Sequence, residues 1–207
     1  MTPPDADKPY HHGNLRAELL GHAERMLAEG GQDALSLREL ARGAGVSHGA
    51  PRRHFADRQA LLDALAEEGF RRLRRELDAA MAGAGGPFAA RLAAFAQAYV
   101  GFATRHTALL RLMHTIKDRP GAEGLRRAND LAFAAPMALI DRARRDGEIV
   151  ADDPDRVAMA VLALLQGLAT VVGAGMAGDR AVPELVSGAV LTLVEGLRPR
   201  DEGPAAR

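Results

Sequence analysis

The sequence predicts an all-α protein in which three short helices precede a larger bundle of long helices. From about residue 14 onward, apolar residues recur with a period close to 3.6, and no stretch alternates as a sheet strand does. Clusters of glycine and proline divide this pattern into helix-length segments. With 47% of its 207 residues apolar, the chain can also bury a sizeable core.

Composition excludes several classes of function. The chain has no cysteine, which removes disulfides, thiolate metal sites and cysteine nucleophiles. Its 27 basic and 27 acidic residues cancel, so any binding to nucleic acid must rest on a local basic patch. Residues 1–13 are polar and contain prolines but no apolar run, which is unlike a secretory signal or a membrane anchor. We therefore expect a cytoplasmic protein with no membrane partner.

The first three helices are predicted from their caps and their ends. Leu15 begins an apolar face that Gly30 and Gly31 terminate. Ser36, followed three residues later by Glu39, forms a capping box that starts a second helix, which stops by Gly45. Ser47 is a suitable cap for a third, short helix that runs to about His54.

Longer helices follow. Asp57 caps one that continues to the glycine-rich break at 83–87, and an aromatic stripe then extends from Phe88 to Phe102 at alternating spacings of four and three residues. Further helices are predicted over 108–115, 122–145, 154–172 and 183–197.

The segment 36–58 has the pattern of a helix-turn-helix. Such a unit needs a small residue where two helices cross and a flexible residue in the turn; Ala41 and Gly45 occupy these places, and Gly45 can take a positive φ at little cost. The segment carries five arginines against two carboxylates, which supplies the local positive patch. Pro51 should distort the first turn of the third helix without breaking it. The alternative is a helical hairpin inside an unrelated α protein.

The stretch from His11-His12-Gly13 through Leu37-Arg38-Glu39-Leu40-Ala41 and Gly45-Val46-Ser47 to Arg53-His54-Phe55-Ala56-Asp57-Arg58 resembles the N-terminal domain of TetR-type transcriptional regulators. The resemblance covers residues 13–73. It implies a homodimeric repressor that binds a double-stranded DNA operator through two helices in neighbouring major grooves and responds to a small-molecule effector.

The resemblance also assigns roles by position. It implies that Ser47, His54 and Arg58 hold phosphates, and that His48, Gly49, Ala50 and Arg53 face or approach bases. Many members have tyrosine where this chain has Arg52, which could hold a phosphate or reach a guanine edge. Ser36 and Arg38 complete the candidate DNA-binding set.

Residues 74–199 should form the dimerisation and ligand-sensing domain. No charge interrupts 157–178, which is long enough to span a bilayer, but its glycines and polar residues favour a helix buried in a dimer core. With the amphipathic helix at 183–197 it would form a four-helix interface. The spacing of Gly173, Gly175 and Gly178 matches a dinucleotide fingerprint, yet its context favours a helix end and a loop.

The resemblance implies an effector pocket in this domain. Its candidate lining residues are Phe95, Tyr99, Phe102, Met113, Phe133 and Met137, although such a stripe is often plain core. His106, His114 and Asn129 are candidates for polar contacts within it.

No enzyme signature accompanies these features. We find no catalytic motif, no metal-ligand spacing and no cofactor site, and therefore predict no enzyme activity, metal or cofactor. A helical-bundle protein that binds or converts a small molecule without any nucleic-acid partner is the alternative function.

Overall fold

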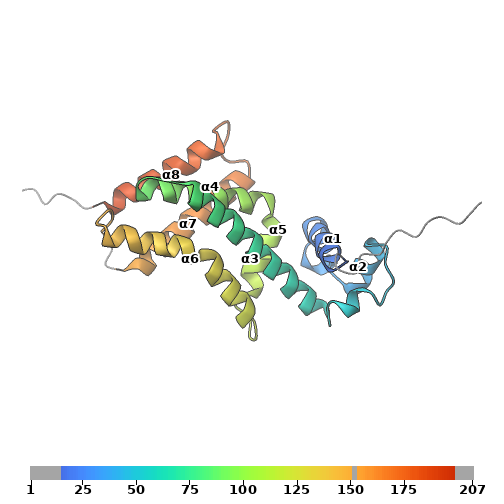
Figure 1. Ribbon diagram of the computed structural model, residues 1–207. Helices are drawn as coiled ribbons and strands as arrows, with labels where there is room; N and C mark the ends of the chain where they lie inside the picture. The colour runs from blue at the N-terminus through green and yellow to red at the C-terminus, as the bar shows by residue number, and fades with distance from the viewer. Residues whose placement is uncertain (1–14, 151–152, 199–207) are drawn as a thin grey trace, which may run out of the picture. The chain divides into compact units, whose positions relative to one another are not determined.

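The computed structural model describes residues 15–150 and 153–198, and all regular structure in these ranges is helical (Figure 1). The predicted all-α class is therefore confirmed. Gly13, Asn14 and Pro199, at the outer limits of the two predicted domains, lie outside the described residues, as do His11 and His12. The elements are α1 (Leu15–Gly30), η1 (Gln32–Ala34), α2 (Leu37–Gly43), η2 (Pro51–Arg53), α3 (Arg58–Gly83), α4 (Phe88–Arg105), α5 (Thr107–Ile116), α6 (Glu123–Arg145), α7 (Pro154–Gly173) and α8 (Val182–Leu197).

The chain divides into two compact units, and the division falls between Ala66 and Glu67, within α3. In the first unit α2 packs against α1 and η2. Leu19, Leu40, Ala41, Phe55 and Leu61 are almost completely buried there and form its core.

Helix ends in the first unit follow the predicted caps. Ser36 Oγ accepts from the Glu39 amide at 3.1 Å and starts α2, while Asp57 Oδ1 accepts from the Ala60 amide at 2.8 Å and starts α3. Gly45 has φ +67°, so the turn after α2 uses the left-handed conformation expected of it.

The third helix differs from the prediction. Residues 48–50 form turns and only Pro51–Arg53 is helical, as a 3₁₀ turn. Proline lacks an N–H, so the Ser47 carbonyl accepts from the Ala50 amide at 2.9 Å, and His54 N donates to Pro51 O at 3.0 Å. Pro51 thus changes the whole segment from α to 3₁₀ geometry, not only its first turn.

The second unit is a helical bundle organised around α4, which contacts α5, α6, α7 and α8. Its aromatic residues Phe88, Phe95, Tyr99 and Phe102 are at most 1% exposed. Helix α6 contains Pro136 and changes direction along its length, as expected where a proline removes a helical hydrogen bond (Figure 1).

The end of α7 shows how the glycine cluster is used. Gly173 is the last helical residue, and Gly175 and Gly178 have φ +69° and +62° in the turns before α8. A helix end and a loop are therefore confirmed here, because a dinucleotide fingerprint requires a strand and an immediate helix.

Candidate nucleic-acid interface and ligand cavity

The segment 47–54 presents its basic side chains outward. Ala50 and Pro51 are buried and anchor the 3₁₀ turn to the first unit, whereas Arg52 and Arg53 are exposed. Neither arginine has an ion-pair partner among the described residues. A solvated guanidinium without a counter-charge is available to bind a phosphate or a base edge.

The preceding helix adds to this surface. Arg38, His48 and Arg52, together with Leu37, line a hollow of about 300 Å³ between α2 and the 3₁₀ segment. Arg42, by contrast, is paired with Glu39, its Nε lying 2.8 Å from Oε2. Three of the predicted DNA-binding residues are therefore brought together around one surface depression.

The remaining predicted DNA-binding residues have varied surroundings. Ser47 and Gly49 are exposed in the turn, and His54 is half-buried with its ring tilted against Phe55, at a centroid distance of 6.4 Å. Ser36 is half-buried, and its hydroxyl is the cap of α2.

Two further residues of the predicted set have contacts that contribute to the fold. Ala50 is 8% exposed, so its side chain lies in the core and does not face outward. Arg58 donates through Nε to Leu35 O at 2.8 Å and through Nη2 to Gln32 O at 2.5 Å. These bonds satisfy carbonyls in the linker before α2, so the guanidinium braces that linker.

The second unit contains a cavity of about 620 Å³, within the range of small-molecule sites. Phe95, Phe133 and Met137 line it, as do two of the candidate polar residues, His114 and Asn129. Tyr99, Phe102 and Met113 are fully buried and do not line it, and His106 packs against Phe102 with a centroid distance of 4.9 Å.

Lys117, Gln166 and Pro136 also line the cavity and were not among the residues predicted to do so. Two of them carried a signal. Lys117 is one of only two lysines in an arginine-rich chain, and Pro136 interrupts an otherwise regular helix.

Burial shifts the pKa values of two titratable side chains in this region. The pKa of His114 is lowered by burial and, to a smaller extent, by the charge of Lys117, which favours the neutral ring. Burial raises the pKa of Tyr99 to about 12. Its hydroxyl has no hydrogen-bond partner in the part of the chain that the structure describes. Tyr99 packs against Phe95 and Phe133, with ring centroids 6.4 and 6.1 Å away.

Two sequence models of known protein families match this chain. The sequence model of "Bacterial regulatory proteins, tetR family" matches residues 19–65, and that of "Tetracyclin repressor-like, C-terminal domain" matches residues 92–192. The chain belongs to the TetR family of regulatory proteins. The predicted resemblance is confirmed, and with it a DNA-binding transcriptional regulator that has an N-terminal helix-turn-helix domain. This family consists of regulators and not of enzymes.

Individual relatives agree with this membership. The structure of a protein of unknown function from Rhodococcus sp. RHA1 is 45% identical in sequence and has a TM-score of 0.84. The match covers 93% of this chain and 100% of that chain. A TetR family transcription regulator from Marinobacter aquaeolei VT8 is 16% identical, covers 91% of this chain and 97% of its own, and has a TM-score of 0.75. The latter likeness shows the fold alone.

A curated relative matches part of the chain. The HTH-type transcriptional repressor KstR2 of Rhodococcus jostii (strain RHA1) is 36% identical over 63 residues, which is 30% of this chain. The match spans 31% of that relative, so less than a third of its length is compared.

Helix α7 is long enough and apolar enough to cross a membrane, and no other helix in the described residues is. Of its most apolar stretch, 22% is buried within the protomer. Soluble core helices pass the same test. Helix α7 also lies within the part matched by the C-terminal family model.

Proposed function

We propose that this chain is a homodimeric transcriptional repressor of the cytoplasm that leaves its operator when a small molecule occupies the cavity of the second unit. The observation that carries the DNA-binding part is the pair of exposed, unpaired arginines, Arg52 and Arg53, beside the buried Ala50 and Pro51. Arg38 and His48, which share a hollow with Arg52, extend the same surface.

We propose different DNA contacts for different residues of this surface. Ser47, Gly49 and His54 lie in the same short segment as the arginines and are proposed to contact phosphates and sugars. Arg53 and His48 are proposed to approach base edges. Arg58 and Ala50 are not part of the proposed interface, because one braces the linker before α2 and the other is buried.

Repression as the sign of regulation is supported by the likeness to KstR2, which is described as a repressor and is 36% identical over 63 residues. Release by a ligand requires that the ligand bind more tightly to a conformation whose two DNA-binding units do not fit the operator. The cavity of about 620 Å³ in the second unit offers the site.

The homodimer is supported by the outer surfaces of α7 and α8. These contact each other within the protomer, and both expose small or uncharged side chains: Ala160, Ala163, Gly167, Thr170, Gly188, Leu191 and Thr192. Charges on these helices are few: α7 exposes Asp155 and Arg156 near its start, and α8 exposes Glu184 and Glu195. A helical face poor in charge can pack closely against a second copy. Two-fold pairing of α7 and α8 would place two DNA-binding units on one duplex.

Selection of bound duplexes from a random pool tests this proposal. The wild-type chain should recover an inverted repeat whose half-sites are centred about one helical turn apart, roughly 34–36 Å, since a two-fold dimer reads a two-fold site. Recovery of unrelated sequences, or of none above background, would contradict it.

A further inference from the structure

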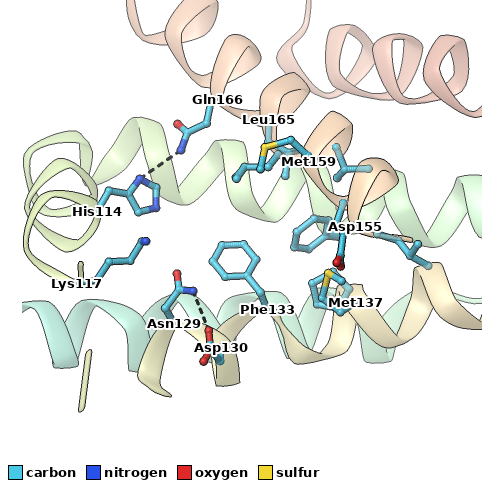
Figure 2. A pocket seen from close by; sticks show the side chains of 16 residues that line it. His114, Lys117, Asn129, Asp130, Phe133, Met137, Asp155, Met159, Leu165 and Gln166 are labelled. Atoms are coloured by element: carbon cyan, nitrogen blue, oxygen red, sulfur yellow. Dashed lines mark hydrogen bonds between the residues drawn. The ribbon is translucent and has the colours of Figure 1, made fainter. Parts of the chain in front are cut away.

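The cavity in the second unit has one polar end and one apolar end. Figure 2 shows His114, Gln166, Lys117 and Asn129 gathered at one end, with Phe133, Leu165 and Met159 between them and Met137 at the other. All four residues at the polar end are half-buried. A ligand that fills the cavity therefore needs a hydrogen-bonding group at one end of an apolar body.

Lys117 supplies the positive charge of this polar end. It follows α5 directly, and its side chain is 24% exposed. Arg126 of α6 donates to the carbonyl oxygens of Lys117 and Arg119, at 3.4 and 3.2 Å, which holds the residue against α6. The ammonium lies 2.6 Å from Asp118, but that carboxylate is 67% exposed. Because an ammonium has three donors, it can bind a second carboxylate from within the cavity.

Besides the exposed carboxylates of Asp118 and Asp130, the neighbours of Lys117 at this end are neutral donors and acceptors. A hydrogen bond of 3.3 Å joins Gln166 Nε2 to His114 Nδ1. Burial favours the uncharged His114 ring by lowering its pKa. The Asn129 amide lies 3.3 Å from Asp130 and contributes a further donor. Lys117 is the one cationic side chain among the residues that line the cavity, and carboxylates already lie near it, so this end suits one further negative charge better than two.

The acidic residues of the cavity are on its rim. Both are exposed: Asp130 lies beside Asn129 at the polar end, and Asp155 lies toward the end occupied by Met137 (Figure 2). A second negative charge at that end would meet Asp155, which disfavours dianions. The apolar residues between the two ends can pack along a hydrocarbon body.

From this distribution of charge we infer that the cavity binds an apolar monoanion, a carboxylate whose head group lies against Lys117 and whose body follows Phe133 and Leu165 toward Met137. The inference deepens the proposed function by naming the class of the effector. It concerns a binding event that can be measured without DNA.

Calorimetric titration of the purified full-length chain tests it, with dodecanoate as the probe. Dodecanol, dodecylamine and dodecanedioate have the same chain length and differ in their charged groups. Dodecanoate should bind at least tenfold more tightly than each of the other three, with one site per chain. Equal affinity for the alcohol and the carboxylate, or tighter binding of the amine, would overturn the inference.

Variants locate the head group. Lys117→Met should lower dodecanoate affinity about tenfold or more and leave dodecanol affinity unchanged, whereas Lys117→Arg should retain most of the dodecanoate affinity. Arg144→Met removes one exposed charge outside the cavity and should change neither the dodecanoate affinity nor the dodecanol affinity. Undiminished dodecanoate binding by Lys117→Met would place the head group elsewhere and refute the proposal.

The result is separable from the proposed function. If dodecanoate binds as described but does not release the selected duplex, the class of ligand stands and its role in release fails. If dodecanoate does not bind while the inverted repeat is still recovered, the regulator stands and this inference fails.

Discussion

Individual side chains in this protein show how their hydrogen-bond partners, more than residue type, decide their role. Arg52, Arg53 and Arg58 are all exposed, yet only Arg58 donates to backbone carbonyls, those of Leu35 and Gln32. The distinction depends on where the linker carbonyls lie in space. A helix-turn-helix pattern lists the arginines of the segment but cannot supply those positions.

Tyr99 is buried with a hydroxyl that no described residue satisfies, which costs free energy. Tyr99→Phe should therefore raise the free energy of unfolding by about 1–3 kcal/mol at neutral pH. Urea unfolding of both proteins measures the difference. A loss of stability in Tyr99→Phe would show that the hydroxyl is satisfied in solution.

The raised pKa of Tyr99 makes the same residue sensitive to alkali. The folded value is about 12, against 10.0 as the ordinary value, so the folded state retains a proton that the unfolded state loses. The wild-type chain should lose stability as the pH rises from 10 toward 12, and Tyr99→Phe should lose less over that window. Parallel pH profiles for the two proteins would contradict the assignment.

Helices and turns could largely be predicted from the sequence where a cap and an apolar period agree. The predicted helix over 108–115 is observed as Thr107–Ile116, and that over 154–172 as Pro154–Gly173. The 3₁₀ geometry of the segment after Ser47 could not be predicted from the sequence, because it depends on whether Pro51 is packed inward. The cavity was predicted only in part, since its polar residues come from α5, α6 and α7 without a shared spacing.

Pro51 controls the direction of the two exposed arginines. A 3₁₀ turn rotates about 120° per residue and an α-helix about 100°, so Arg52 and Arg53 point differently in the two geometries. Pro51→Ala restores a donor for the Ser47 carbonyl, and residues 47–54 should shift toward α-helical Cα chemical shifts. Specific operator affinity should fall about tenfold, while binding to unrelated duplexes changes little. Unchanged shifts would mean that tertiary packing, not proline, sets the 3₁₀ turn.

At the scale of the whole molecule, the proposed function requires two copies. The outer faces of α7 and α8, which carry few charges, are the surfaces proposed to pair, and Leu191 on α8 is 47% exposed in the protomer. Leu131 on α6 is 53% exposed and provides a matched apolar residue on another helix.

Leu191→Glu should weaken the dimer at least about tenfold, because it buries an unpaired carboxylate in the interface. Leu131→Glu should leave the dimer intact. Sedimentation equilibrium measures both dissociation constants. If the two variants associate equally well, α8 does not form the interface.

Operator binding by Arg53→Ala tests the central claim most directly. Measured against the selected inverted repeat and an unrelated duplex over a range of salt concentrations, the variant should lose about ten- to a hundredfold in specific affinity, as expected for one lost base contact per half-site. Its helical content and dimer mass should match the wild type, and Arg144→Ala should bind as the wild type does. Wild-type affinity and salt dependence in Arg53→Ala would contradict the account.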